Sequence, residues 1–266
     1  MSLPPRLYKY ENLTAQTLQN LKGQVLYFGS PLGFNDPYDC ALTPNIRHPT
    51  DDEVETIRLT YLQNTTTPPL AHQEFEVIST NDLRQMLLRA GRSGLEKGIN
   101  EFLATRGVTC FSQRNDDLLM WSHYGGQYKG ICLEFSTASE PFAKIRSVQY
   151  VKTLPTIDLA PLLQGDFDLV SNLFCTKSES WSYEMEWRAI HAIAGTKYVY
   201  PAESLTGVYF GPEIDRESLE IICLILRGQN ESVKFWRGTR STTEFKVLFE
   251  EFTYTPHIEA KKNGLI

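Results

Sequence analysis

Short runs of β-forming residues recur along the chain, and helical segments do not separate them in a regular alternation. Val25-Leu26-Tyr27-Phe28 runs directly into a turn-rich loop, whereas the strand-like residues 107–112 and 130–135 enclose one short helical segment. A doubly wound parallel sheet instead alternates strand and helix. The order of segments therefore predicts an α+β fold, with a mixed, mostly antiparallel sheet or sheets and flanking helices.

A helical insertion is predicted at about residues 45–105. Asp51 and Asp52 supply negative charge to the start of one helix, and Ser79-Thr80-Asn81-Asp82 is typical of a cap before the next. No internal repeat or low-complexity linker marks a boundary in the 266 residues. We therefore expect a single α+β domain over residues 1–266 that carries this insertion, although a chain of this length also has room for two smaller domains.

Composition narrows the class of protein. The net charge of −6 argues against a broad nucleic-acid-binding face, and no stretch reaches the roughly 20 apolar residues that span a bilayer. The first residues lack the charged-then-apolar pattern of a secretory signal. The five cysteines are widely spaced and form no Cys-x-x-Cys pair or Cys/His cluster. We expect a cytoplasmic protein without membrane association and without a metal site.

The strongest candidate for a functional site is Trp181-Ser182-Tyr183-Glu184-Met185-Glu186-Trp187-Arg188. In a β-strand, Glu184, Glu186 and Arg188 would share one side. The like charges repel, so one carboxylate is expected to have a raised pKa. One glutamate would then stabilise a developing positive charge, and the other would act as a base or a positioning group. The alternative is a half-exposed strand whose glutamates pair with Arg188 and a nearby lysine.

A second candidate site is the predicted helix over residues 116–124, which carries Trp121, His123 and Tyr124. Its amino end has unpaired backbone N–H groups that suit an anion such as a diphosphate. Asp116 and Asp117 oppose this, because they already complement the helix dipole. The alternative interpretation makes all three aromatic side chains ordinary core residues.

Two further motifs carry polar groups. Asn35 and Asp36 lie in a loop before Pro37, where their oxygens suit a ribose or a cation, although a self-hydrogen-bonded turn also explains them. Leu7-Tyr8-Lys9-Tyr10 is predicted as the first strand. It places Tyr8 and Tyr10 on one face and Lys9 on the other, so only one of these two sets can face a cleft.

Taken together and in this order, these motifs resemble the bacterial family of domains of unknown function numbered 2971. The resemblance rests on Tyr8-Lys9-Tyr10, on residues 34–39, on Cys110-Phe111-Ser112, on residues 119–124 and on residues 181–188. It spans roughly residues 6–250. The insertion near 45–105 carries no motif of that family, and the family name implies no activity.

A more remote resemblance is to ADP-ribosyltransferases, which cleave the nicotinamide–ribose bond of NAD. Those folds present a polar NAD contact on a first strand, a serine on a later strand, and a catalytic glutamate on a last strand, in one branch as Glu-x-Glu. Lys9 with its flanking tyrosines, then Ser112, then Glu184-Met185-Glu186 follow this order. The usual first-strand arginine or histidine is replaced by lysine or tyrosine.

This resemblance implies an intracellular enzyme that uses NAD as a substrate and transfers ADP-ribose to a protein or nucleic-acid acceptor. Glu186 would stabilise the oxocarbenium-like transition state, and Glu184 would position or deprotonate the acceptor. If the chain is an enzyme of this kind, we expect Glu186, Ser112, His123 and Asp36 to converge on one cleft.

Two other functions stay open. One is a non-catalytic ligand-sensing or protein-interaction module of a stress or phage-defence system, in which the aromatic residues form a pocket without turnover. The other is a metal-assisted hydrolase or nuclease that uses Asp36, Asp39, His123 and a glutamate. Several standard enzymes are set aside, because the chain lacks a Gly-x-Ser-x-Gly elbow, a phosphate-binding Gly-x-x-x-x-Gly-Lys loop and a His-Glu-x-x-His pair.

Overall fold

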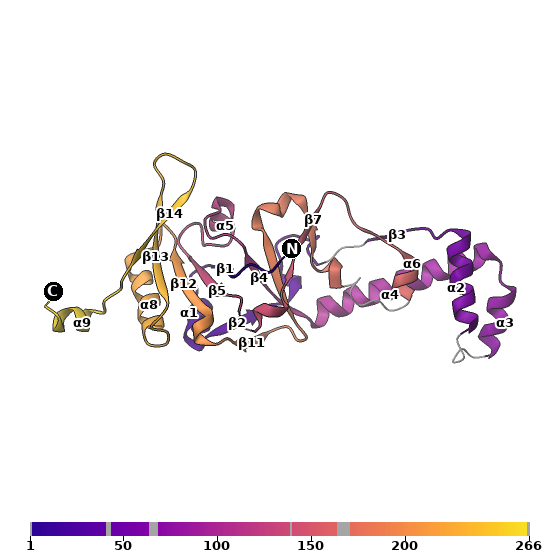
Figure 1. Cartoon of the computed structure of the whole chain (residues 1–266), viewed down its shortest axis with the longest axis horizontal. Helices are drawn as coiled ribbons and strands as arrows, with labels where there is room; N and C mark the ends of the chain where they lie inside the picture. The colour runs from indigo at the N-terminus through magenta and orange to yellow at the C-terminus, as the bar shows by residue number, and fades with distance from the viewer. Residues whose placement is uncertain (1, 41–43, 64–68, 139, 164–170, 265–266) are drawn as a thin grey trace. The chain divides into compact units, whose positions relative to one another are not determined.

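The computed structural model describes residues 2–40, 44–63, 69–138, 140–163 and 171–264. The chain divides into two compact units (Figure 1). The sheet unit comprises Met1–Ser30, Arg106–Val148 and Ser180–Ile266, and the helical unit comprises Pro31–Thr105 and Gln149–Glu179. Each unit is described by itself. That the two units form a single domain stays a prediction.

The sheet unit is built on one large sheet, which has eight strands within the part of the chain that the structure describes. In order across the sheet, the strands are β14 (Val247–Phe252), β13 (Lys234–Arg240), β12 (Leu205–Phe210), β5 (Ile131–Ser136), β1 (Arg6–Glu11), β4 (Gly107–Ser112), β10 (Glu186–His191) and β6 (Arg146–Ser147). Only β12 and β13 pair in parallel, and the other neighbours are antiparallel. The predicted α+β fold with a mixed, mostly antiparallel sheet is confirmed.

One face of this sheet is apolar and carries the main core. Strand alternation places Leu7, Leu133 and Val208 on this face, where helices α1 (Ala15–Gly23) and α8 (Arg216–Arg227) pack against them. Thr14 is a residue type that predicts a helix cap from sequence, and it caps α1, since its hydroxyl accepts a hydrogen bond from the Thr17 N–H at 3.1 Å. A two-stranded ribbon of β2 (Val25–Phe28) and β11 (Thr196–Val199) adds Leu26 and Phe28 to the same core.

The opposite face of the sheet combines aromatic and polar side chains. The short helix α5 (Leu118–His123) contributes Met120 and Trp121 to a second cluster with Tyr10, Tyr209 and Val247. The remaining helices of the sheet unit are short: η2 (Phe142–Lys144), η3 (Glu179–Glu184, beginning at the last residue of the helical unit), η4 (Ala202–Ser204) and α9 (His257–Lys262).

The helical unit contains the predicted insertion. Its helices include η1 (Pro31–Gly33), α2 (Asp51–Gln63), α3 (Pro69–Val77), α4 (Thr80–Thr105) and α6 (Leu159–Leu163). Two short parallel pairs join β3 (Asn45–Ile46) to β8 (Thr156–Ile157) and β7 (Gln149–Val151) to β9 (Thr176–Ser178). Helix α4 buries a stripe at helical spacing, formed by Leu83, Leu87, Gly91, Leu95, Ile99 and Phe102.

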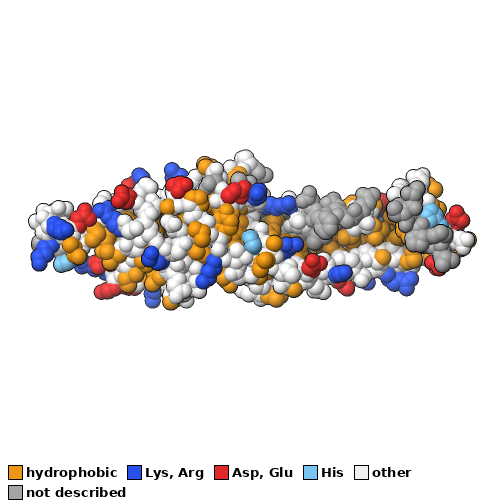
Figure 2. All heavy atoms as spheres, turned by 90° about the horizontal axis from the view of Figure 1, so that it is seen from below, with side chains coloured by type: hydrophobic (Ala, Val, Ile, Leu, Met, Phe, Trp, Pro, Cys, Tyr) orange, Lys and Arg blue, Asp and Glu red, His pale blue; other side chains and the backbone are white. Residues whose placement is uncertain are grey.

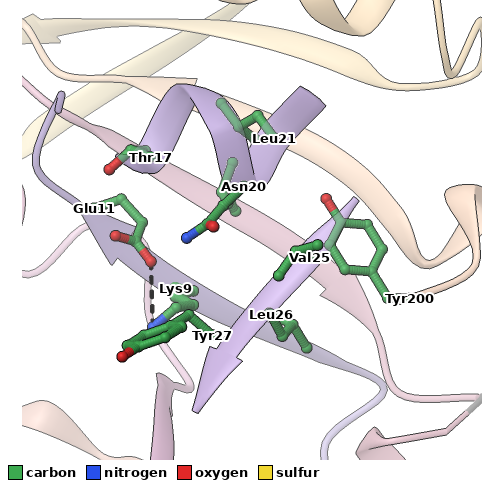
Figure 3. Close-up of a pocket in the computed structure, with 10 residues that line it drawn as sticks. Lys9, Glu11, Thr17, Asn20, Leu21, Val25, Leu26, Tyr27 and Tyr200 are labelled. Atoms are coloured by element: carbon green, nitrogen blue, oxygen red, sulfur yellow. Dashed lines mark ion pairs between the residues drawn. The ribbon is translucent and has the colours of Figure 1, made fainter. Parts of the chain in front are cut away.

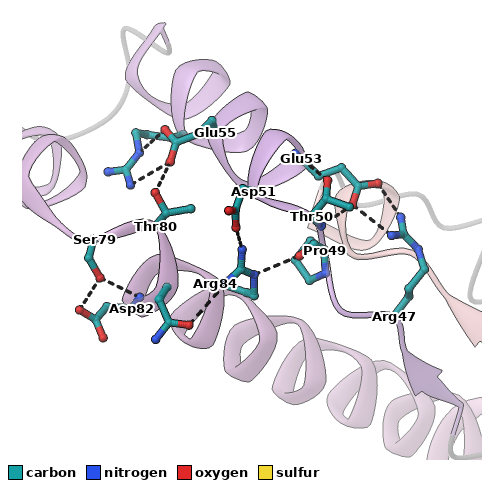
Figure 4. A network of polar contacts seen from close by, with 12 residues as sticks. Arg47, Pro49, Thr50, Asp51, Glu53, Glu55, Ser79, Thr80, Asp82 and Arg84 are labelled. Carbon is teal, nitrogen blue, oxygen red and sulfur yellow. Dashed lines mark hydrogen bonds and ion pairs between the residues drawn. The ribbon is translucent and has the colours of Figure 1, made fainter.

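Polar contacts fix the starts of α2 and α4 (Figure 4). Glu53 accepts two hydrogen bonds from the Arg47 guanidinium, at 3.1 and 2.5 Å, and one from the Thr50 N–H at 2.8 Å. These bonds lower the pKa of Glu53 to about 2. The predicted cap of α4 is also present, because the Ser79 hydroxyl accepts from the Asp82 N–H at 3.1 Å.

Two predicted elements differ from the structure. From sequence alone, the run of residues 159–176 is predicted to be a helix. It starts as α6, but Thr176 begins strand β9 instead. The strand predicted from Glu184 starts only at Glu186, because η3 ends at Glu184 and Met185 turns the chain with a φ of 44°. Residues 164–170 of the predicted helix lie outside the described residues.

The distribution of charged side chains on the surface agrees with the net charge of −6. Figure 2 shows acidic and basic side chains interspersed on the face of the sheet unit that it displays. Among the described residues, no helix is both long and apolar enough to cross a membrane.

Two glycines of α4 give a matched test of packing in the helical unit. A Cβ on Gly94 would meet no atom within 4 Å, whereas one on Gly91 would lie 2.5 Å from the Leu159 Cδ1. Gly94→Ala should raise the free energy of unfolding by about 1 kcal/mol, because alanine favours the helix. Gly91→Ala should be less stable than Gly94→Ala by about 1–3 kcal/mol, because Leu159 is buried and must repack. Urea denaturation followed by circular dichroism measures both, and equal stabilities would contradict the described packing.

Glu53 gives the helical unit a pH dependence. Its pKa is about 2 in the folded chain against an ordinary value of 4.5, so its contribution is present above about pH 4.5 and is lost as the pH falls towards 2. Glu53→Gln should therefore weaken the loss of stability between these pH values. Glu96→Gln, at an exposed glutamate of α4, serves as the control. Thermal melts across this pH range, at low and high salt, are the measurement, and the difference between the two variants should shrink in high salt.

Candidate active site

Four polar side chains form a straight row across the mixed face of the sheet. Tyr8 of β1 pairs with Glu134 of β5 on one side and with Ser112 of β4 on the other, and Ser112 pairs with Glu186 of β10. Residues paired across neighbouring strands project to the same side, with strands about 4.8 Å apart. We call this set the Glu134–Tyr8–Ser112–Glu186 row. Three of its members, Tyr8, Ser112 and Glu186, come from motifs that the sequence singled out.

Glu186 is held by a buried, bidentate ion pair. The Arg188 Nε and Nη2 donate to the two carboxylate oxygens of Glu186 at 2.7 and 2.9 Å. Both residues are buried, with exposed fractions of 5 % for Glu186 and 1 % for Arg188. Charge-assisted fork geometry of this kind is strong and fixes orientation. The alternative of a half-exposed strand is therefore wrong about exposure, although the pairing of a glutamate with Arg188 that it expected is present.

The thiol of Cys110 lies next to this ion pair. Cys110 pairs with Arg188 across β4 and β10 and is partly buried. Burial and the negative charge of Glu186 raise the pKa of the Cys110 thiol well above its ordinary value. Cys110 is therefore a neutral neighbour of the carboxylate, with no thiolate character near neutral pH.

Glu184 reaches the site by a different route from the one predicted. It ends η3, so strand alternation does not relate it to Glu186. Its buried carboxylate accepts a hydrogen bond from the Tyr124 hydroxyl at 2.7 Å. Its backbone oxygen accepts one from the Ser112 hydroxyl at 2.7 Å. Ser112 thus ties the end of η3 to strand β4, and the expected raised pKa of one glutamate stays a prediction.

Of the three side chains singled out at α5 and its C-cap, Tyr124 contacts Glu184 and His123 contacts the neighbouring Tyr183. Tyr124 bonds to Glu184 as described, and His123 is exposed, with its Nδ1 3.1 Å from the Tyr183 hydroxyl. Trp121 differs, because it is fully buried and donates its indole N–H to the Asn115 carbonyl at 2.7 Å. Trp121 is therefore a core residue with no exposed surface for a ligand.

The amino end of α5 does not offer the expected anion site. The Asp117 carboxylate accepts hydrogen bonds from the N–H groups of Leu119 and Met120 at 2.9 and 3.0 Å. The donors that an anion would need are therefore already used by this cap.

An aromatic cluster borders the same region. The rings of His123, Trp181 and Tyr183 lie with their centroids 6.0–6.4 Å apart. Trp181 and Tyr183 are half-buried. Flat rings at this spacing can pack against a planar ligand group.

The first strand divides its three motif residues between the two faces of the sheet. Tyr8 belongs to the row, and Tyr10 shares its face, where the Tyr10 hydroxyl donates to the Arg114 carbonyl at 2.9 Å. Lys9 projects to the opposite, apolar face and pairs with Glu11 at 3.3 Å. Lys9 is thus separated from Glu186 by the sheet itself.

Glu134 is the member of the row that sequence reasoning missed. Its buried carboxylate accepts from the hydroxyls of Thr206 at 2.7 Å and Tyr209 at 2.9 Å, and lies 3.4 Å from the Arg6 guanidinium. Burial and the Glu134 charge raise the pKa of Tyr8 to about 12. The signal was a single acidic residue inside the apolar run Ile131-Cys132-Leu133-Glu134-Phe135, because a buried charge needs built-in partners.

Asn35 and Asp36 belong to the helical unit. Asp36 is buried and accepts from the Tyr38 N–H at 2.9 Å through its side chain, as a self-bonded turn requires, and Asn35 is exposed. Asp39 forms a buried ion pair with Lys177 at 3.1 Å. Convergence of Asp36 with Glu186 stays a prediction. Within the described residues, no group of three or more His, Cys, Asp and Glu side chains is arranged to hold a metal ion.

Comparison with known proteins bears on the family only. No curated protein matches the sequence, and no solved structure does. The family model described as protein of unknown function, DUF2971, matches residues 120–189. The matched segment includes Glu134, the whole of η3 and residues 186–188. Tyr8 and Ser112 lie outside it. The predicted resemblance to the DUF2971 family is thus confirmed over residues 120–189 of this chain.

Proposed function

We propose that the sheet unit is an NAD-using, ADP-ribosyltransferase-like enzyme that cleaves the nicotinamide–ribose bond in the bacterial cytoplasm. One observation carries the proposal. Tyr8, Ser112 and Glu186 come from three motifs that are far apart in the sequence, and they are consecutive members of one row on one face of the sheet. Their order along the chain is the order that the remote resemblance requires.

The ion pair suits Glu186 for the central role. Cleavage of the C1′–N bond sends the bonding electrons to the nicotinamide nitrogen and leaves positive charge on the ribose. A carboxylate that is already ionised and fixed stabilises this charge without reorganisation. Arg188 supplies both properties, because its guanidinium donates to both carboxylate oxygens.

Glu184 is the proposed positioning group for the acceptor. The acceptor attacks C1′ with an electron pair and loses a proton, which a neighbouring carboxylate can take. The Tyr124 hydroxyl donates to one oxygen of Glu184 at 2.7 Å and so orients this carboxylate. The Ser112 hydroxyl holds the Glu184 backbone at the end of β4, so both glutamates are oriented by residues of the same site.

The residues present fit one half of NAD better than the other. The His123, Trp181 and Tyr183 rings offer planar surfaces for a nicotinamide ring. The diphosphate is less well served, because Glu134 and Glu186 both carry negative charge in the row. The first-strand arginine or histidine of the ADP-ribosyltransferases is absent here. We therefore propose that the diphosphate binds outside the Glu134–Tyr8–Ser112–Glu186 row.

The first test is NAD turnover by the wild-type chain and two variants. Glu186→Gln should lower nicotinamide release by about 10²–10³-fold, because a fixed charge at the transition state is lost. Glu250→Gln, at an exposed glutamate of β14, should leave the rate unchanged. Chromatography of released nicotinamide is the measurement. The proposal fails if the wild type neither releases nicotinamide nor shows a thermal shift with NAD.

Stability must be measured alongside activity, because Glu186→Gln also breaks the buried ion pair. Removal of one partner from such a pair costs about 3–5 kcal/mol, so the folded fraction of this variant must be confirmed by circular dichroism. Glu184→Gln gives a second, milder test, since glutamine keeps an oxygen for Tyr124. Its melting temperature should stay closer to the wild-type value while transfer to an acceptor falls.

A ligand-sensing module is the second candidate, and a specific observation favours it. Three buried acidic side chains of this site each have a partner within the protein, namely Arg188 for Glu186, Tyr124 for Glu184 and Tyr209 for Glu134. A satisfied polar network of this kind can also serve to shape a binding surface. Nucleotide binding without release of nicotinamide would select this function.

A further inference from the structure

The two glutamates of the candidate site are joined by a residue with an unusual backbone conformation. Met185 has a φ of 44°, in the left-handed region that residues other than glycine seldom adopt. Met185 is also 38 % exposed, so its side chain is not a core residue that the fold must bury. A strained backbone of this kind persists only where surrounding contacts hold it.

Backbone contacts hold this turn on both sides. The Met185 N–H donates to the Ser182 carbonyl at 3.2 Å, and the Met185 carbonyl accepts from the Gln113 N–H at 3.2 Å. The Glu184 carbonyl accepts from the Ser112 hydroxyl at 2.7 Å. Ser112 and Gln113 are consecutive in the sequence. The end of β4 therefore holds the carbonyls of two consecutive residues of the turn.

The turn separates two carboxylates that are held in different ways. Glu186 is fixed in β10 by its buried ion pair, and its carbonyl accepts from the Val148 N–H at 2.9 Å. Glu184 lies at the end of η3. In a continuous strand the two glutamates would share one face, but the left-handed turn interrupts the strand between them. The conformation of Met185 therefore sets where Glu184 lies, while Glu186 stays in place.

We propose that Met185 is a positioning residue: its left-handed backbone places Glu184 in the active site, and its side chain is dispensable. The effect on the reaction rests on the proposed function, whereas the effect on the turn can be measured without NAD. With water as the acceptor, a C1′–O bond replaces the C1′–N bond, and Glu184 takes the proton from water. A displacement of about 1 Å in such a group can lower the rate about 100-fold.

The first experiment uses substitutions that separate the backbone from the side chain. Met185→Ile keeps an apolar side chain of similar size, but its β-branch opposes a positive φ. Met185→Asn and Met185→Gly discard that side chain and favour the left-handed region. Met185→Ile should lower nicotinamide release from NAD at least about tenfold per folded molecule, and the other two variants should stay within about threefold of the wild type. A side chain that contacts the substrate would give the opposite order.

Hydrogen exchange gives a second readout, which needs no NAD. The Gln113 N–H should exchange at least about tenfold faster in Met185→Ile than in the wild type, because its acceptor, the Met185 carbonyl, is displaced. The Val148 N–H should keep its protection, because Glu186 stays in place. Met185→Asn should leave both amides as they are in the wild type. NMR of the full chain measures these rates.

Gln24 supplies the matched control. It also has a positive φ, of 52°, and it joins α1 to β2. These two elements, with Lys9 and Glu11 of β1, line a small pocket on the opposite face of the sheet from the row (Figure 3). Gln24→Ile should lower the melting temperature, because it carries the same backbone strain. It should leave nicotinamide release per folded molecule and the exchange of Gln113 unchanged.

Two results would overturn the inference. One is a Met185→Ile variant that matches the wild type in activity and in Gln113 protection. The other is loss of activity in folded Met185→Asn and Met185→Gly, and these two variants decide if Met185→Ile does not fold. A wild-type chain that releases no nicotinamide overturns the proposed function, and with it the role of Met185 in that reaction. The exchange rates then still decide what sets the turn.

Discussion

The antiparallel pairing of β4 with β1 and β10 is the constraint on which the candidate site depends. It places Ser112 opposite Tyr8 on one side and opposite Glu186 on the other. A shift of either pairing by one residue would send these side chains to opposite faces of the sheet. The apolar face prevents such a shift, because Phe111 and Trp187 would lose their buried positions in the main core. The core therefore sets the register, and the register assembles the site.

Burial of charged side chains on the mixed face costs free energy, and the partners that offset this cost also help to fix the site. Glu186 and Arg188 are tolerated in the interior because their fork geometry satisfies both groups. Glu134 is tolerated because hydroxyls of Thr206 and Tyr209 surround it. These partners restrict each carboxylate to one orientation. Such restriction favours chemistry that needs a fixed charge, and it equally favours a rigid binding surface, which is why turnover of NAD separates the two proposed functions.

The two faces of β1 carry different polar side chains, because successive residues of a strand project to opposite faces. Tyr8 contributes to the row, whereas Lys9 and Glu11 line the pocket beside α1. A single six-residue strand therefore supplies polar groups to both faces of the sheet. The remote resemblance assigned the first-strand contact to Lys9 and its flanking tyrosines together, and only Tyr8 and Tyr10 share the face of Glu186.

Local patterns in the sequence were sufficient for the α+β class, the helical insertion, the Thr14 and Ser79 caps and the order of the motifs, because period and capping depend on neighbouring residues. They were insufficient for Glu184, whose separation from strand β10 depends on the positive φ of Met185. They also missed Glu134, whose partners Thr206 and Tyr209 are more than 70 residues away. Which face a strand residue occupies, and what lies opposite it, is decided by pairing between distant segments. Only the tertiary structure therefore shows that some of these polar residues form a row on one face of the sheet and that others line a pocket on the opposite face.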